Sequence, residues 1–156
     1  MEKVGDWDKV HKLMNNLDKN LKKAQQIALM RWGLLAERIA TQHIASQDLG
    51  WTPLDSKTLS KKVAQGYSEN ILVQSSTYFR NITSYVEGDT AYAGVKREVS
   101  YSNGVDVANI AAVHEFGTEH IPERPLWQPT LKEVQEAIGS DKRLNPATIF
   151  FNLLSV

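Results

Sequence analysis

Two histidines and two glutamates lie within seven residues in the stretch His114–His120, HEFGTEH. Imidazole and carboxylate groups bind zinc, so this stretch could serve a metal-dependent hydrolase. A zinc-protease helix places its two histidines four positions apart, which makes both rings project from one face. Here the histidines are six positions apart, Gly117 lies between them, and Pro122 follows. The spacing does not fit such a helix, although a loop could join both rings to a third ligand.

Other catalytic patterns do not occur in the sequence. The absence of cysteine excludes disulfides, thiolate metal sites and cysteine nucleophiles. No Gly-x-Ser-x-Gly elbow and no glycine-rich phosphate loop is found. Glu115, Glu119 and Glu123 recur at steps of four, but a glycine and a proline prevent one helical face from carrying all three. We therefore expect no enzyme activity, no cofactor and no metal, with a metal-dependent hydrolase built on the His114–His120 segment as the alternative.

The length and charge of the chain exclude several classes of protein. Its 156 residues predict a single domain spanning residues 1–156, and no apolar run approaches the roughly 18 residues that cross a membrane. Eighteen basic residues balance eighteen acidic ones, which argues against the broad basic surface that DNA binding requires. Residues 1–62 carry a net charge of +4 and residues 63–156 a net charge of −4. This asymmetry is either ordinary scatter or a pair of opposite surfaces that meet between identical subunits.

The N-terminal part, residues 1–48, is expected to be helical. Apolar residues recur there at steps of three and four: Val10, Leu13, Leu17, Leu21, Ala24 and Ala28. This period predicts an amphipathic helix, with Asp6 as its N-cap. Because forty residues are long for one globular helix, we expect a break in NNLDKN, between Asn15 and Asn20. The result would be a short helix followed by a long one.

The remainder predicts short elements around a small sheet. Gly50 and Pro53 impose a turn, and Asp55 or Ser56 caps a short helix. In the strand-rich part, residues 70–102, alternating β-branched and aromatic residues around Gly88-Asp89 predict a hairpin, and a further short strand precedes an Asn-Gly turn.

Helices are expected again in the C-terminal third. Asp106 caps a helix that ends before Gly117, a second helix starts near Leu126, and Asn145 caps an apolar tail within residues 140–156. The predicted fold class is therefore α+β, with a long N-terminal helix packed on a small antiparallel sheet.

Several short motifs follow one another in a fixed order along the chain. They are Gly50-Trp51-x-Pro53-Leu54 with Thr58 and Lys61 or Lys62 behind it, Ile71-Leu72, Phe79-x-Asn81-Ile82, Tyr92-Ala93, His114-Glu115-Phe116-Gly117 and Ile121-Pro122-x-Arg124-Pro125. In this order they resemble the phage virion-morphogenesis, or tail-completion, family of head-to-tail neck proteins. The resemblance covers residues 7–138. It departs at Glu123, where a small residue is usual, at Ser76-Thr77, where Thr-Gly is common, and at Leu126-Trp127, where Phe-Leu is usual.

The resemblance implies a structural part of a tailed-phage virion. The family's proteins form a ring, here expected to hold six copies, at the head–tail neck or at the top of the tail, as completion, terminator or head-to-tail joining proteins. The implied partners are further copies of the chain and other neck, connector, tail-tube or sheath proteins. The implied location is the virion, after assembly in the host cytoplasm. Sequence-specific nucleic-acid binding and membrane binding are not expected.

The proline-rich stretch supplies the candidate contact residues. Prolines hold Glu123-Arg124 extended, which suits the Arg124 guanidinium to a bidentate bond with a carboxylate. That carboxylate belongs either to the same chain, as Glu115 or Glu119, or to a neighbouring subunit. Trp127 is a candidate anchor because Trp and Arg are enriched in interface hot spots. The expected contact residues are Arg124, Glu123, Trp127 and Glu119, together with Phe150 and Phe151 of the apolar tail. The expected structural residues are Trp51, Pro53, Leu54, His114, Glu115, Phe116, Gly117, Pro122 and Pro125.

Overall fold

A computed structural model of the chain describes residues 5–154, and the fold is organised along one helix of 40 residues, α1 (Trp7–Ser46). The other elements in chain order are α2 (Ser56–Ala64), α3 (Thr77–Arg80), β1 (Ile82–Glu87), β2 (Thr90–Val95), α4 (Val107–Phe116), α5 (Trp127–Ser140), the 3-10 turn η1 (Lys142–Leu144) and α6 (Pro146–Leu154). This order confirms the predicted α+β class. The ends of the predicted domain, residues 1–4 and 155–156, lie outside the described residues.

Helix α1 is continuous, so the predicted break between Asn15 and Asn20 is wrong. Asparagine and aspartate weaken a helix by less than about 1 kcal/mol each, whereas only proline would prevent its hydrogen bonding. An ion pair of 3.0 Å between Asp18 and Lys22, one turn apart, joins the segment to the next turn. The predicted N-cap is confirmed, because the Asp6 carboxylate accepts a hydrogen bond from the main-chain N–H of Lys9.

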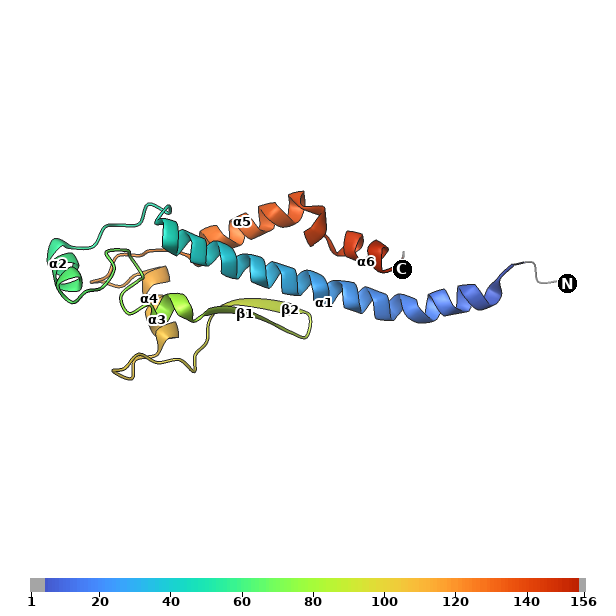
Figure 1. Ribbon diagram of the computed structural model, residues 1–156, viewed down its shortest axis with the longest axis horizontal. Helices are drawn as coiled ribbons and strands as arrows, with labels where there is room; N and C mark the ends of the chain where they lie inside the picture. The colour runs from blue at the N-terminus through green and yellow to red at the C-terminus, as the bar shows by residue number, and fades with distance from the viewer. Residues whose placement is uncertain (1–4, 155–156) are drawn as a thin grey trace.

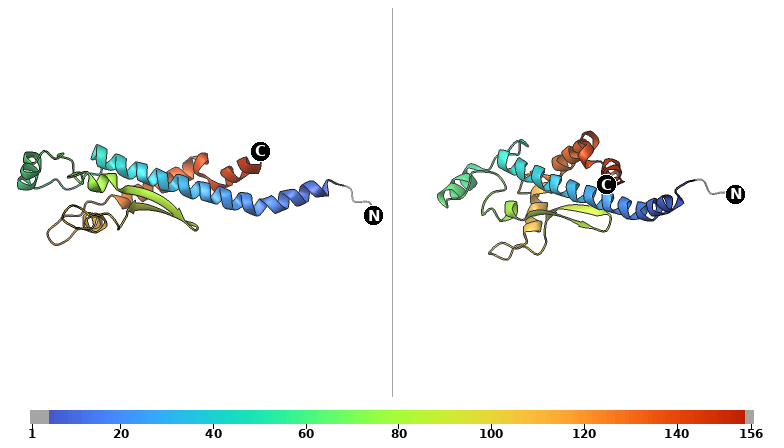
Figure 2. Two further views of the ribbon diagram at one scale, coloured as in Figure 1. Left: turned by 60° about the horizontal axis from the view of Figure 1, so that its bottom comes forward. Right: turned by 45° about the vertical axis from the view of Figure 1, so that its right-hand side comes forward.

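The two strands form an antiparallel hairpin that packs on α1 (Figures 1 and 2). The turn at Gly88-Asp89 is confirmed, with Gly88 at a φ of 56°. Gly33 is the contact point on the helix, because a Cβ atom there would lie 3.1 Å from the Cβ of Ser84. The Ser84 hydroxyl donates a hydrogen bond of 2.9 Å to the carboxylate of Glu37 on the next helical turn. A small residue in α1 thus sets how closely the sheet approaches.

The predicted strand before the Asn-Gly turn does not form. A single bridge joins Ser100 to Asp106, with the turn at Asn103-Gly104 between them. Asp106 is already the N-cap of α4, since its carboxylate accepts a hydrogen bond from the N–H of Ala108. The helix therefore begins before a second pair of residues can extend the ladder.

Apolar side chains gather in two clusters on α1. The larger joins α1 to the turn after it, the hairpin and α4, with buried members Ala40, Ile44, Trp51, Tyr78, Ile82, Val107, Ala111 and Leu126. The smaller consists of Ala24 and Ala28 of α1 and Ile149 of α6. The apolar tail therefore folds back onto its own chain, and its N-cap, Asn145, is as predicted. None of the helices within residues 5–154 is long and apolar enough to cross a membrane.

The first part of α1 lies beyond both clusters. Residues 7–23 are exposed apart from the half-buried Asn20, and they extend past the end of the hairpin and past α6 (Figure 1). The apolar stripe from Val10 to Leu21 therefore has no neighbour among residues 5–154 that covers it, although α1 packs on the sheet as predicted. The tip of the hairpin reaches only as far as Gln26, whose side chain donates a hydrogen bond to the Gly88 carbonyl.

Candidate functional site

The proline-rich stretch between α4 and α5, residues 117–125, forms a tight hook. Gly117 has a φ of 68° and a ψ of 178°, a conformation that is essentially restricted to glycine. A Cβ atom at this position would lie 3.0 Å from the Glu123 nitrogen and 3.1 Å from the Ile121 oxygen. The Thr118 side chain closes the bend by accepting hydrogen bonds from the N–H groups of His120 and Ile121. The local sequence therefore dictates a reversal of the chain at Gly117.

Glu115, in the last turn of α4, caps the helix on the far side of the hook. Its carboxylate accepts hydrogen bonds from the main-chain N–H groups of Leu126, at 2.7 Å, Trp127, at 3.0 Å, and Gln128, at 3.2 Å. These groups begin α5, where no helical carbonyl is available to them. A carboxylate there also interacts favourably with the helix dipole. Glu115 therefore fixes the position of α5 relative to α4.

The hook also clasps the turn that follows α1. The indole Nε1 of Trp51 donates a hydrogen bond of 2.8 Å to the carbonyl of Pro125. In return, Arg124 Nε donates to the Thr52 carbonyl at 3.0 Å, and Arg124 Nη2 makes a longer contact of 3.5 Å with the Pro53 carbonyl. We call these contacts between residues 51–53 and residues 124–125 the clasp. It joins segments more than seventy positions apart in the sequence.

Arg124 is thus satisfied within its own chain. Its side chain is 5% exposed, and burial lowers the pKa of its guanidinium. The sequence leaves open whether Arg124 bonds within its own chain or to a neighbouring subunit. In the structure it bonds within its own chain. The partners, however, are main-chain carbonyls, because Glu115 is occupied by α5, and no ion pair joins Arg124 to Glu119 or any other carboxylate in residues 5–154.

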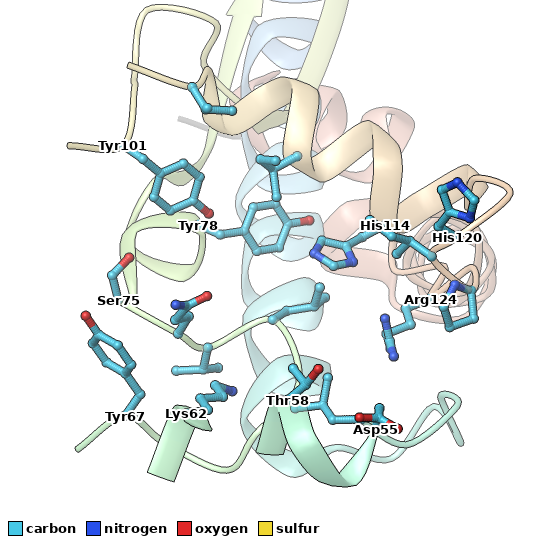
Figure 3. A pocket seen from close by; sticks show the side chains of 18 of the residues that line it. Asp55, Thr58, Lys62, Tyr67, Ser75, Tyr78, Tyr101, His114, His120 and Arg124 are labelled. Carbon is cyan, nitrogen blue, oxygen red and sulfur yellow. The ribbon is translucent and has the colours of Figure 1, made fainter. Parts of the chain in front are cut away.

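A cavity of about 800 Å³ opens beside the clasp (Figure 3). Tyr78 and Tyr101 lie on one side, with His114, His120 and Arg124 on the other. Burial is the main cause that raises the pKa of Tyr78 well above its ordinary value, and it also raises the pKa of Tyr101. Both phenols are therefore neutral around pH 7, and the cavity wall combines these aromatic rings with the guanidinium of Arg124.

The two histidines of the sequence motif differ in environment. His114 is half-buried, its Nδ1 atom has no hydrogen-bond partner among the described residues, and burial, followed by the charge of Arg124, lowers the pKa of its imidazole. His120 is exposed. Both line the cavity, yet among residues 5–154 no three His, Asp or Glu side chains group closely enough to hold a metal ion. The third ligand required by the hydrolase alternative is not found in that part of the chain.

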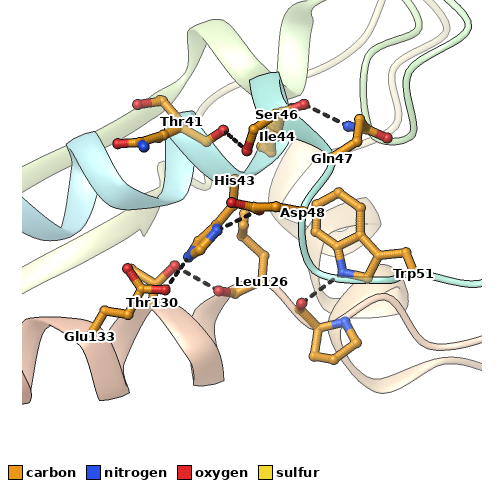
Figure 4. A network of polar contacts seen from close by, with 12 residues as sticks. Thr41, His43, Ile44, Ser46, Gln47, Asp48, Trp51, Leu126, Thr130 and Glu133 are labelled. Carbon is orange, nitrogen blue, oxygen red and sulfur yellow. Dashed lines mark hydrogen bonds and ion pairs between the residues drawn. The ribbon is translucent and has the colours of Figure 1, made fainter.

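A polar network around His43 joins α1 to α5 (Figure 4). His43, buried near the end of α1, places Nδ1 2.8 Å from an oxygen of Asp48, and hydrogen bonding to His43 is the main cause that lowers the pKa of that carboxyl. His43 Nε2 lies 3.1 Å from an oxygen of Glu133, an ion-pair distance without hydrogen-bond alignment. The network holds the two helices together beside the clasp.

The other predicted contact residues, and several of the predicted structural residues, are divided between surface and core. Glu119, Glu123 and Pro122 are exposed on the hook. Trp127 is half-buried against the larger cluster. Phe150 packs on the smaller cluster, while Phe151 is 64% exposed and meets the Phe150 ring edge-on. Leu54 is half-buried, and Pro53 is exposed. The hook therefore offers its acidic residues outward and keeps its arginine inside.

Two of these roles do not follow from the sequence pattern. Glu115 was recognised as a motif residue, but its function as a cap eleven to thirteen positions away was not. The available signal was Leu126-Trp127 itself, since α5 begins with no Ser, Thr, Asp or Asn to cap it locally. The role of His43 is not apparent from the sequence, because its partners, Asp48 and Glu133, come from the turn after α1 and from α5.

Comparisons with known proteins add nothing to this geometry: family models, curated proteins and solved structures yield no match to the chain.

Proposed function

We propose that this chain is a structural protein of a tailed-phage virion. Six copies would form a ring at the head–tail neck or at the top of the tail. The observation that carries the proposal is the clasp. The Trp51-x-Pro53 motif and the Pro122-x-Arg124-Pro125 motif carry much of the resemblance to tail-completion proteins, and they bond to each other through Trp51 and Arg124. The motif residues thus act as one architectural unit.

The chemistry of the hook supports assembly over catalysis. Glu115 accepts three main-chain N–H groups and Arg124 donates to two carbonyls, so both charged residues are engaged in holding segments in place. Gly117 permits the reversal of the chain, and the prolines keep the segment after it stiff at little entropic cost. A stiff unit with acidic side chains outside suits a subunit that must present one surface to a neighbour.

The proposal is tested by deleting the coding sequence from the genome that carries it and examining released particles by electron microscopy. Unjoined heads and tails, or tails of irregular length, restored by the intact gene, are the expected result. Particles of normal form and infectivity after deletion would contradict the proposal.

The metal-dependent hydrolase is retained as a second candidate because of one observation. His114 and His120 line the same cavity, and the buried His114 Nδ1 has no hydrogen-bond partner within residues 5–154. Zinc measured on the purified protein decides between the two functions. One zinc per chain, lost in His114→Ala and in His120→Ala, would favour the hydrolase. Metal below one-tenth of that amount in the intact protein would reject it.

A further inference from the structure

The N-terminal segment of α1, residues 7–23, carries an apolar stripe that nothing in the described chain covers. Trp7, Val10, Met14, Leu17 and Leu21 follow one another at steps of three, four, three and four, which keeps them on one helical face. Their side chains are between 38% and 64% exposed. An apolar face of this extent marks a contact surface.

A groove at the opposite end of the molecule has matching properties. It lies between α4 and α5, has a volume of about 450 Å³, and is lined by Val95, Ala108, Ala112, Phe116, Trp127 and Leu131 among others. Phe116 is 74% exposed, more than any other large apolar side chain in residues 5–154, and Leu131 is 58% exposed. Because α4 lies far from the first turns of α1 (Figure 1), a chain cannot place this segment in its own groove.

The two surfaces carry opposite charge. Residues 7–23 hold five lysines and two aspartates, a net charge of +3. Residues 106–131, which include α4, the hook and the start of α5, hold four acidic residues and the buried Arg124, a net charge of −3. Two copies of the helical segment would repel each other, whereas the segment and the groove region attract. Charge therefore favours the groove of a second copy over a second helix as the partner.

We propose that residues 7–23 of one copy lie in the α4–α5 groove of the next copy. The segment is about 25 Å long at 1.5 Å per residue, and a helix that lays its apolar face in a groove is a common mode of recognition. Each copy would contribute its helical segment to one neighbour and its groove to another, so the contact is heterologous. Such contacts close into a ring when the rotation between copies allows it. The inference rests on the proposed self-assembly and names the surfaces that perform it.

Two double variants and their mixture test the proposal by native mass spectrometry. The segment variant, Val10→Lys with Leu17→Lys, places two charges on the apolar stripe. The groove variant, Phe116→Lys with Leu131→Lys, places two charges in the groove. The altered side chains are exposed, so circular dichroism should show unchanged helicity. Asn15→Lys with Asn16→Lys is the matched control, because it adds the same charge away from the apolar stripe of the same helix. The intact protein and this control are expected to assemble equally.

The segment variant and the groove variant, each measured alone, are expected to remain monomers of 17.5 kDa. Their 1:1 mixture should give a heterodimer of about 35 kDa, twice the mass of one chain, because each variant supplies the surface that the other lacks. A groove variant that still assembles, or a mixture that fails to pair, would overturn the proposal while leaving self-assembly intact. An intact protein that stays monomeric at every concentration would also overturn it, and the particle experiment above would then judge the virion function independently.

Discussion

The indole N–H of Trp51 donates a hydrogen bond of 2.8 Å to the carbonyl of Pro125, 74 positions further along the chain. In the sequence, the two residues belong to separate short motifs. Their contact, with the return bond from Arg124 to the Thr52 carbonyl, makes the two motifs one structure.

Trp51→Phe is expected to lower the free energy of unfolding by about 1–3 kcal/mol, because the Pro125 carbonyl loses its donor and the smaller ring fills less of the core. Trp51→Ala should cost more, about 3–5 kcal/mol, by leaving a cavity in the larger cluster. Urea denaturation measures both. Trp7→Phe, at a residue that is 50% exposed, is the control and should change stability little. Equal losses in all three variants would show that the clasp contributes nothing.

Arg124→Lys should destabilise the protein by about 1–3 kcal/mol although the charge is kept, because a lysine amine cannot reproduce the geometry of Nε and Nη2 toward two carbonyls. Arg97→Lys, at an exposed position, serves as the control. The comparison of the two midpoints in urea provides the measurement. A midpoint for Arg124→Lys equal to that of the intact protein would contradict the assigned role.

Glu115→Gln should loosen the start of α5, because the amide keeps one acceptor oxygen but loses the charge that faces the helix N-terminus. We expect a loss of about 1 kcal/mol and faster hydrogen exchange at the amides of Leu126, Trp127 and Gln128. Glu119→Gln, on the exposed part of the hook, should leave those exchange rates unchanged. Unchanged exchange in both variants would exclude the capping role.

The stability of the protein should depend on pH through His114. Burial and the charge of Arg124 lower the pKa of this imidazole in the folded state, so below its ordinary value of 6.5 the unfolded chain binds a proton more readily than the folded one. Stability from this group is complete above that pH and is lost as the pH falls below it toward the folded-state value.

Replacing His114 tests this dependence. The His114→Gln variant should show a flatter decline in unfolding free energy between pH 6.5 and lower values than the intact protein does. His11→Gln, in the exposed first part of α1, is the control and should keep the slope. Parallel pH profiles for the intact protein and His114→Gln would contradict the prediction.

Local rules made much of the fold predictable. Asp6, Asp106 and Asn145 cap their helices as expected, since a short polar side chain bonds to main-chain N–H groups two or three positions away. Gly117 reverses the chain as expected, since no other residue fits its conformation and its contacts. In each case the cause lies within a few residues of its effect.

The features that the sequence does not reveal depend on contacts between residues that lie far apart in the chain. The period of the stripe from Val10 to Leu21 shows which face of α1 is apolar, but it does not show whether anything covers that face. The expectation that Arg124 pairs with a carboxylate failed for a similar reason, because carbonyl groups at Thr52 and Pro53 leave no trace in the side-chain pattern. Tertiary contacts decided both outcomes.

The virion role is tested most directly by quantitative mass spectrometry of purified phage particles produced by the genome that encodes this chain. With isotope-labelled peptides as standards and a capsid protein as the internal reference, the proposal predicts about six copies of the chain in every particle. Particles that are complete and infectious yet contain none of it would contradict the proposal.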